Sequence, residues 1–439
     1  MKNPRETALK GLIALRRNGT WPDLFLKQEG EGMSSADLKL CAEILYGTVE
    51  NMSLIDYYIG CFSRVKTKKM VPQLLDALRM TVYQIVFLDR IPDSAAINEG
   101  VKLVKKYASY SLSGFANGVL RSISREKDSL PPVPKDNFAE YLSVRYSHPL
   151  WFAEEMTGEI GAEETEKLFE ADNAKPAVTA RVNDIKISAD ELIGVLKEEG
   201  IEAQKAEELS NCIVFKSGTG VASSRAFKEG LFYIQDMASQ LAVMALNPQK
   251  GDMLIDMCAS PGGKTLTAAQ MMQNEGSITA CDIHPHKIQL IRENAEKYGA
   301  NIVKAVLWDG TKENKQLSET VDRVICDVPC SGMGIIRKKP DIRFKKKEDI
   351  EELPNIQYKI LENAASYLKK GGRLLYSTCT VRSAENEKVF KRFLENHSEY
   401  EAVPFELPYS ISAPKGFVTL YPHREGFDGF FISLMERKI

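Results

Sequence analysis

The chain has 439 residues, enough for two to four domains, and 44% of them are hydrophobic and 27% charged. This composition excludes a disordered chain, and no apolar run approaches the ~20 residues that a membrane span needs. The formal net charge is -2 but it is uneven: residues 1–130 hold 19 Lys and Arg against 14 Asp and Glu, a net +5, and the remainder is a net -7. A basic module joined to an acidic one fits a polyanion-binding appendage on an enzyme, and a chance asymmetry of solvated surfaces fits equally well.

The eight cysteines are irregularly spaced without any Cys-x-x-Cys pair, and the five histidines do not cluster at ligand spacing. We therefore expect free thiols and no metal site. The N-terminal residues MKNPRETALKGL lack an apolar core followed by a cleavage site. We expect no signal peptide and a cytoplasmic location.

Apolar residues recur at helical spacing throughout the first 130 residues, which predicts an all-α domain over 1–130. The predicted helices cover 7–17, 34–49, 74–87, 95–107 and 114–125. Ser34 and Ser35 are candidate N-caps, and Gly19 ends the first helix. The sequence SLPPVPKDN, residues 129–137, then predicts an extended linker because prolines forbid a regular helix.

Two further domains are predicted after the linker. Residues 138–228 mix short helices with β-rich runs and indicate a small α+β domain, with strands at 177–182, 212–215 and 231–235 and a helix at 189–198. Residues 229–439 indicate a doubly wound, Rossmann-like α/β domain with buried parallel strands. Its predicted strands are 253–257, 277–281, 302–306, 321–326 and 373–377, with helices at 285–298 and 356–368 between them.

Ligands of such sheets bind beyond the carboxyl ends of the strands, where four polar segments lie. The first, DMCASPGGKT (256–265), nearly matches the phosphate loop GxxxxGK[ST], which makes an NTPase the alternative function. However, Cys258 occupies the first glycine position, and Pro261 removes an N–H donor from a phosphate cradle.

A nucleoside cofactor without a phosphate chain fits this segment better. Pro261, Gly262 and Gly263 predict a tight turn that leads into a helix N-terminus, which can receive a carboxylate. Asp282 ends the next strand, where an acid can bind ribose hydroxyls. Asp309 follows the third strand and either contacts the adenine end or serves only as a turn residue. An acid-rich site of this kind favours S-adenosylmethionine over a triphosphate.

Two cysteines follow strands at the same edge, Cys330 in CDVPCSG (326–332) and Cys379 in YSTCT (376–380). Buried cysteines are usually inert, but two in polar turns at a catalytic edge indicate thiol chemistry. A thiolate that adds to C6 of cytosine makes C5 nucleophilic toward a sulfonium methyl. Asp327 is placed to hydrogen-bond or protonate N3 of that base.

Two groups of basic residues are candidate RNA contacts. One follows Cys330 and is interrupted by Phe344; its members are Arg337, Lys338, Lys339, Arg343, Lys345, Lys346 and Lys347. The other consists of Arg64, Lys66, Lys68 and Lys69. Either group could follow an RNA backbone, and a solvated charge run is the alternative for both.

The order of these motifs over about 200 residues resembles the Sun/RsmB family of 16S ribosomal RNA cytosine-C5 methyltransferases. The matching segments are YIQDMASQLA (233–242), DMCASPGGKT, Asp282, DVPCSG, RKKPDIRF (337–344), YSTCTV (376–381) and DGFFISLMER (428–437). The N-terminal region looks more loosely like a NusB-type RNA-binding domain. Ser260 and Val328 depart from the residues common in the family without changing a reacting atom.

The resemblance implies a role for each matching residue. Cys379 is implied as the nucleophile, and Cys330 as the residue that assists product release. The implied S-adenosylmethionine site is lined by Cys258, Ala259, Ser260, Pro261, Gly262, Gly263, Lys264, Asp282, Asp309 and Asp327. Lys264 has a second implied role, in which it orients the substrate or the cysteines.

The implied substrate is 16S rRNA, protein-free or in an early assembly intermediate, and we expect a monomeric, membrane-independent enzyme. A binding factor with an inert methyltransferase half is the non-enzymatic alternative. The intact cysteines and acids disfavour it.

Overall fold

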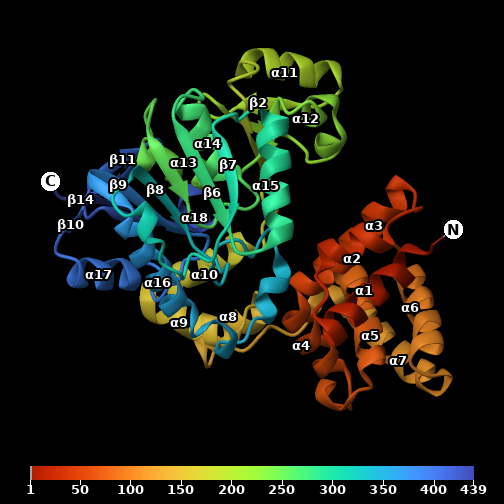
Figure 1. Ribbon diagram of the computed structural model, residues 1–439. Coiled ribbons are helices and arrows are strands. Elements are labelled where there is room, and N and C mark those ends of the chain that lie inside the picture. Colours follow the sequence, from red (N-terminus) through yellow and green to blue (C-terminus); the bar gives the residue numbers. More distant parts are fainter. Residues whose placement is uncertain (1) are drawn as a thin grey trace. The chain divides into compact units, whose positions relative to one another are not determined.

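The computed structural model describes residues 2–439, which fall into two compact units (Figure 1). The first unit contains the chain up to Asn173 together with the segment 336–346, and the second contains residues 174–335 and 347–439. The chain therefore leaves the second unit after Ile335 and re-enters it at Lys347. No helix among the described residues combines the length and apolar character needed to cross a membrane.

The N-terminal part of the first unit is all-α, as predicted. Its helices are α1 (Pro4–Asn18), α2 (Pro22–Glu29), α3 (Ser35–Glu50), α4 (Met52–Phe62), α5 (Pro72–Phe87), α6 (Asp93–Tyr107) and α7 (Ser113–Arg125). Ser34 caps α3 by accepting from the N–H of Asp37, and Gly19 ends α1 in the left-handed region at φ +62°. The apolar face of each helix contributes to one buried core, in which Leu45 and Leu78 are fully enclosed.

Residues 130–137 form neither helix nor strand, as the prolines predicted. The hydroxyl of Tyr57 donates to the carbonyl of Pro132 at 2.7 Å, which attaches this linker to α4. The first unit then continues through three helices, α8 (Phe138–Arg145), α9 (Leu150–Ile160) and α10 (Ala162–Asp172).

The second unit begins with a small antiparallel sheet of order β2-β3-β1-β4. Its elements are β1 (Val178–Val182), α11 (Ala189–Glu198), β2 (Ala203–Lys205), β3 (Cys212–Phe215), α12 (Arg225–Lys228) and β4 (Phe232–Ile234). The strands and helix predicted between 177 and 235 all form here. The region 138–228, expected as one domain, thus contributes helices to the first unit and a sheet to the second.

The large sheet of the second unit has the order β10-β14-β9-β8-β5-β6-β7, with β13 paired to β14. Its strands are β5 (Met253–Asp256), β6 (Ser277–Asp282), β7 (Val303–Leu307), β8 (Val321–Asp327), β9 (Leu368–Thr378), β10 (Tyr400–Ala402), β13 (Phe417–Leu420) and β14 (Phe430–Arg437). A separate hairpin joins β11 (Phe405–Leu407) to β12 (Ile411–Ala413).

The five strands that the sequence predicted form the parallel part of a mixed sheet. Strands β7, β6, β5, β8 and β9 are parallel, but β14 runs antiparallel to β9. Strands β10 and β13 each pair with β14 in antiparallel orientation. The residues 428–437 had been noted only as a motif. A buried apolar run indicates a strand without indicating its direction, which depends on the preceding connection.

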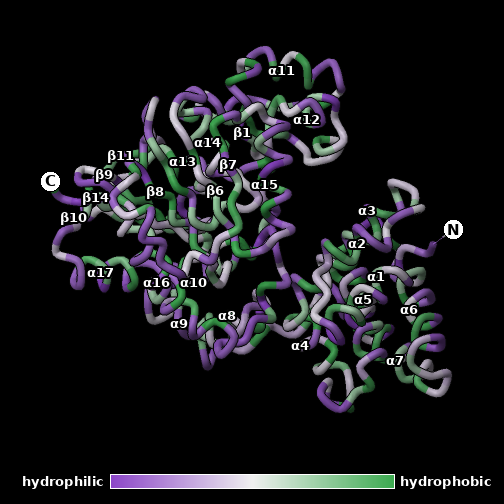
Figure 2. The backbone as a smooth tube through the Cα atoms, viewed as in Figure 1, coloured by the Kyte–Doolittle hydropathy of each residue, from purple (hydrophilic) through white to green (hydrophobic). Residues whose placement is uncertain are grey.

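Helices cover both faces of this sheet. They are α13 (Met237–Leu246), α14 (Gly263–Met271), α15 (Pro285–Tyr298), α16 (Leu353–Ser366), α17 (Glu387–Asn396) and α18 (Pro422–Glu425). Neighbouring strand residues enter opposite cores: Ile325 packs with α13 and α14, whereas Val324 packs with α16 and α17. Figure 2 shows hydrophilic and hydrophobic stretches alternating along α15, which has one buried face.

Candidate active site

The carboxyl ends of the five parallel strands form one edge of the large sheet, and the predicted site residues follow these ends (Figure 1). The 257–263 loop follows β5, Asp282 ends β6, and Asp309 lies two residues after β7. Asp327 ends β8, and Cys379 comes directly after β9. The topology therefore brings together the segments that the sequence had singled out.

A tight glycine turn connects β5 to α14. The N–H of Gly262 donates to the carbonyl of Ala259 at 2.6 Å, and the bond between Ser260 and Pro261 is a cis peptide. Gly262 has φ +108°, and a side chain built there would meet nothing within 4 Å. Among the described residues, no side chain caps α14. Its first N–H groups are thus available to a carboxylate in open space.

Asp282 and Asp309 are both held by local hydrogen bonds. Asp282 is 5% exposed and accepts from the N–H of His284 at 3.0 Å. Asp309 accepts from the N–H and the hydroxyl of Thr311, and these bonds hold the pKa of Asp309 below its usual range. Asp309 therefore stabilises the turn that contains it, and its contact with adenine stays a prediction.

Two exposed apolar residues beside these acids had escaped the sequence analysis. Ile283 is 53% exposed, and Leu307, which pairs with Asp282 in the sheet register, is 56% exposed. They lie where β6 and β7 end. The sequence contained a signal for Ile283, because this apolar residue directly follows Asp282, the acid that ends a predicted strand.

Lys264 and Asp327 form an ion pair between α14 and β8. The Lys264 Nζ lies 2.7 Å from Asp327 Oδ2, and the Ser377 hydroxyl donates to Asp327 Oδ1 at 2.8 Å. Lys264 Nζ also lies 4.9 Å from the ring centroid of Phe430. Each carboxylate oxygen of Asp327 thus accepts a hydrogen bond, one from the Lys264 ammonium and the other from the Ser377 hydroxyl.

Cys330 and Cys379 meet, although 49 residues separate them: their Sγ atoms are 3.2 Å apart. The hydrogen bond from the Cys330 thiol lowers the pKa of Cys379. The same hydrogen bond, followed by burial, raises the pKa of Cys330 well above its usual value. The pair therefore favours a thiolate on Cys379 and a thiol on Cys330.

Asp256 is a further buried acid that the sequence analysis did not single out. It ends β5, is 1% exposed, and accepts from the Thr265 hydroxyl at 2.6 Å. Burial raises the pKa of Asp256 to about 7. Burial is likewise the main reason that the pKa of the neighbouring Cys258 thiol is raised. Cys258 is thus a thiol that lines the loop rather than a second nucleophile.

In the basic segment after Cys330, the prediction that Arg343 is a candidate RNA contact was wrong. Residues 336–346 belong to the first unit, where Pro340–Phe344 forms a short 3₁₀ helix, η6. Arg343 is 5% exposed and donates to the carbonyls of Glu50 at 2.8 Å and Tyr146 at 2.7 Å. Arg343 is therefore neither an RNA contact nor a solvated charge, but a buried donor that satisfies backbone acceptors.

The second basic group has a different environment. Arg64, Lys66, Lys68 and Lys69 are all exposed on the loop between α4 and α5. Their role in RNA binding stays a prediction. In the part of the chain that the structure describes, no three His, Cys, Asp or Glu side chains are grouped to hold a metal ion.

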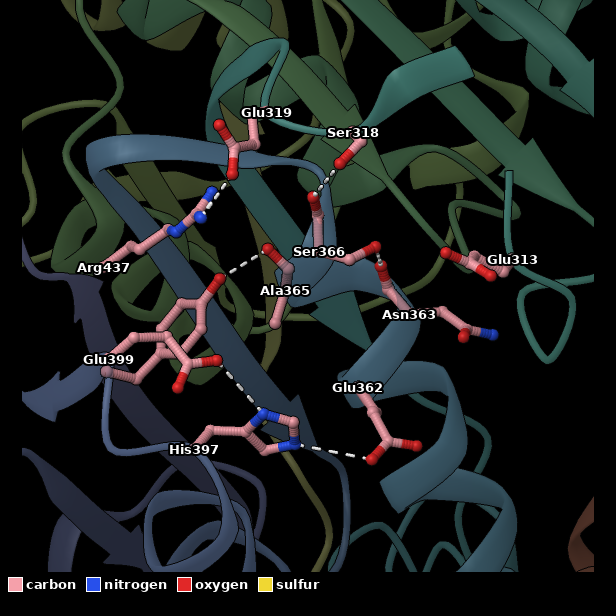
Figure 3. A pocket seen from close by; sticks show the side chains of 11 residues that line it. Glu313, Ser318, Glu319, Glu362, Asn363, Ala365, Ser366, His397, Glu399 and Arg437 are labelled. Carbon is pink, nitrogen blue, oxygen red and sulfur yellow. Dashed lines mark hydrogen bonds and ion pairs between the residues drawn. The ribbon is translucent and has the colours of Figure 1, made fainter. Parts of the chain in front are cut away.

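A cavity of about 420 Å³ lies at the opposite, amino edge of the large sheet (Figure 3). Figure 3 shows its charged side chains directed toward one another: Arg437 contacts Glu319, and His397 contacts Glu362 and Glu399. These residues lie where β8, β9 and β10 begin and β14 ends. The cavity is thus separate from the edge that carries the cysteines.

The chain matches three family models along its length. Residues 243–436 match the 16S rRNA methyltransferase RsmB/F, residues 2–125 match the NusB family, and residues 148–222 match the ferredoxin-like domain of RsmF/B-like methyltransferases. The chain is 37% identical to the probable ribosomal RNA small subunit methyltransferase B of Bacillus subtilis (strain 168), with 99% of this chain and 98% of that protein covered. The chain belongs to the ribosomal RNA small subunit methyltransferase B family.

Other members and solved structures agree with this family. The probable ribosomal RNA small subunit methyltransferase B of Synechocystis is 32% identical, and 100% of both chains is covered. The crystal structure of PH0851 is similar with a TM-score of 0.83 and 29% identity, over 100% of this chain and 99% of that one. A methyltransferase homologue from Pyrococcus horikoshii is 28% identical with a TM-score of 0.61, over 70% of this chain and 100% of that one. The resemblance to the Sun/RsmB family and to NusB is confirmed.

Proposed function

We propose that this member of the family transfers a methyl group from S-adenosylmethionine to C5 of a cytosine in small-subunit ribosomal RNA, through a covalent bond between Cys379 and C6. The observation that carries the proposal is the pair of thiols, 3.2 Å apart, at the carboxyl edge of the sheet. The names of the curated relatives support the ribosomal RNA substrate. Methyl transfer to nitrogen or ribose needs no thiolate, so the paired cysteines favour carbon as the acceptor.

The donor set of the loop after β5 fits S-adenosylmethionine. The open backbone at Gly262 and the uncapped start of α14 would receive the amino-acid carboxylate. Asp282 would accept from the ribose hydroxyls, and Ile283 and Leu307 would flank the adenine. A triphosphate would meet the acidic side chains of Asp256, Asp282 and Asp327, and the lysines beside them are already ion-paired, Lys264 with Asp327 and Lys287 with Asp282.

Bound S-adenosylmethionine supplies an electrophilic methyl group on sulfur. The Cys379 thiolate adds to C6 of the flipped cytosine, the electron pair of the C5–C6 double bond forms a C4–C5 double bond, and the C4–N3 pair moves to N3. N3 gains a proton as this bond forms. Lys264 is the proton source: a proton passed along the 2.7 Å contact to Asp327 reaches N3. C5 thereby becomes nucleophilic.

Release reverses the addition. Once C5 carries the methyl group, the C5 proton leaves to a base. N3 returns its proton through Asp327 to Lys264, the C5–C6 and C4–N3 double bonds re-form, and the bond from Cys379 to C6 breaks. Cys379 departs as a thiolate. The thiol of Cys330, at 3.2 Å, donates to that sulfur and stabilises the departing charge.

We propose that the NusB-like region and its exposed residues Arg64, Lys66, Lys68 and Lys69 bind the RNA backbone. The substrate form we propose is protein-free 16S rRNA or an early assembly intermediate, acted on by a cytoplasmic monomer.

The test is methyl transfer from labelled S-adenosylmethionine to protein-free 16S rRNA by wild type, Cys379→Ala and Cys330→Ala. We expect 5-methylcytosine from wild type, no product from Cys379→Ala, and a covalent protein–RNA adduct on a denaturing gel from Cys330→Ala. Cys61→Ala, an exposed cysteine of α4, is the matched control and should keep full activity. Normal turnover by Cys379→Ala, or a methylated nitrogen as product, would reject the mechanism. RNA-stimulated ATP hydrolysis without methylation would restore the NTPase alternative.

A further inference from the structure

A buried carboxylate, Glu385, lies directly behind the loop that carries Cys330. Glu385 is 0% exposed, although a glutamate is rarely buried without partners. Its Oε2 accepts from the backbone N–H of Ser331 at 2.8 Å, and its Oε1 accepts from Arg382 at 2.9 Å. The carboxylate thus forms a charge-assisted hydrogen bond to the residue next to Cys330.

The other side of Cys330 is held by the same group of side chains. The fully buried Gln357 donates from Nε2 both to Glu385 Oε2 and to the carbonyl of Pro329, each at 3.0 Å. The backbone is therefore held at the residue before Cys330 and at the residue after it. A cysteine held on both sides has its thiol position determined by these contacts.

The Cys330 loop is also attached to the Cys379 loop. The hydroxyls of Ser331 and Thr380 are 3.0 Å apart, and the N–H of Gly334 donates to the carbonyl of Cys379 at 3.0 Å. Arg382, whose guanidinium donates to Glu385, also donates from its backbone N–H to the Thr380 hydroxyl at 3.4 Å. Glu385 thus connects the Cys330 loop to Gln357 of α16 and to Arg382, the residue that binds Thr380 of the Cys379 loop.

We propose that Glu385 is the positioning residue for Cys330: its carboxylate, with Gln357, keeps the Cys330 thiol within reach of Cys379. This inference rests on the proposed covalent mechanism, in which Cys330 acts only at release. Loss of the carboxylate therefore slows the breaking of the Cys379–C6 bond more than its formation. The covalent adduct between protein and RNA then accumulates.

The experiment compares wild type, Glu385→Gln, Cys330→Ala and the double variant with 16S rRNA and S-adenosylmethionine. Glu385→Gln keeps the side-chain size but replaces a charged acceptor by an amide. We expect one near-stoichiometric burst of methylated RNA, followed by turnover at least tenfold slower than wild type, with adduct on a denaturing gel. Because Glu385 acts through Cys330, adding Glu385→Gln to Cys330→Ala should change the release rate by less than twofold.

Two controls separate this role from general destabilisation. Glu436→Gln makes the same substitution in another Arg–Glu pair of the large sheet, 2.8 Å to Arg373, and should turn over as wild type does. Cys379→Ala combined with Glu385→Gln should form no adduct.

The outcomes distinguish the two proposals. If wild type and Cys330→Ala behave as proposed but Glu385→Gln turns over normally, the positioning role is wrong and the mechanism stands. Uniform loss of the burst and of turnover by Glu385→Gln, without adduct, would also overturn the positioning role. If wild type forms no 5-methylcytosine, the proposed function itself fails.

Discussion

The two edges of the large sheet carry similar side chains in different arrangements. At the amino edge, His397 and Arg437 each pair with glutamates around a cavity of about 420 Å³ (Figure 3). At the carboxyl edge, the Lys264–Asp327 pair lies beside two thiols, an uncapped helix and an open glycine turn. The cavity alone would have indicated the amino edge. Reactive groups next to unpaired backbone donors identify the carboxyl edge instead.

The largest difference between the two edges should be the loss of methylation rate when the lysine of each lysine–aspartate pair is replaced. Lys264→Met should lower the single-turnover methylation rate about 10²- to 10⁴-fold, the range that proton transfer typically contributes. Lys369→Met is the matched control, because Lys369 lies 2.8 Å from Asp322 at the amino edge, and it should leave that rate within about twofold. A cofactor titration separates the roles of Lys264: unchanged affinity means that Lys264 acts in the chemical step, by supplying the proton or by orienting the substrate or the cysteines, and weakened affinity means cofactor binding. Equal effects of the two substitutions would remove the distinction between the edges.

A second effect, smaller, concerns the pH dependence of Cys379. The hydrogen bond from Cys330 lowers the pKa of Cys379, so the thiolate fraction of Cys379 at a given pH should exceed that of an ordinary thiol. Cys330→Ala removes the donor but leaves most of the burial, and the pKa of Cys379 should rise. Alkylation of Cys379 by iodoacetamide, followed by peptide mass spectrometry from pH 6 to 10, measures this shift. An identical pH profile in the two proteins would show that Cys330 does not donate to Cys379.

The smallest effect should come from the amino-edge cavity. Glu319 is an exposed partner of Arg437, and solvent screens that ion pair, so Glu319→Gln should leave the urea midpoint of unfolding essentially unchanged. His397→Gln should keep the methylation rate within about twofold. Urea unfolding and the methylation assay test both. A tenfold loss of methylation by either variant would mean that the amino edge takes part in the reaction.

The sequence predicted where the five parallel strands lie along the chain and which residues follow them. Strand-length apolar runs and the motifs after them were enough to place Asp282, Asp327 and Cys379 at one edge. The direction of β14 was not predicted, because hydropathy records burial and not strand direction. The burial of Arg343 was not predicted either, because a run of basic residues does not indicate which backbone carbonyls will accept hydrogen bonds from it.

Long-range partners were likewise beyond the sequence. The 3.2 Å contact of Cys330 with Cys379 and the network around Glu385 join residues 28 to 54 positions apart. Such contacts depend on how strands are ordered in the sheet. Periodicity over short windows contains no information about them. Glu385 had one weak signal, as an acid shortly after a cysteine at a strand end.

The return of residues 336–346 to the first unit has a consequence for modular exchange. A gene fragment that ends at Asn173 would encode α1–α10 without η6, and the carbonyls of Glu50 and Tyr146 would lose their buried donor, Arg343. Recombination that replaced only the N-terminal helices would bring in a partner that had never been selected beside this segment. The NusB-like region and the catalytic domain are therefore coupled in their inheritance: substitutions around Glu50 and Tyr146 must remain compatible with a residue encoded 293 and 197 positions later, respectively.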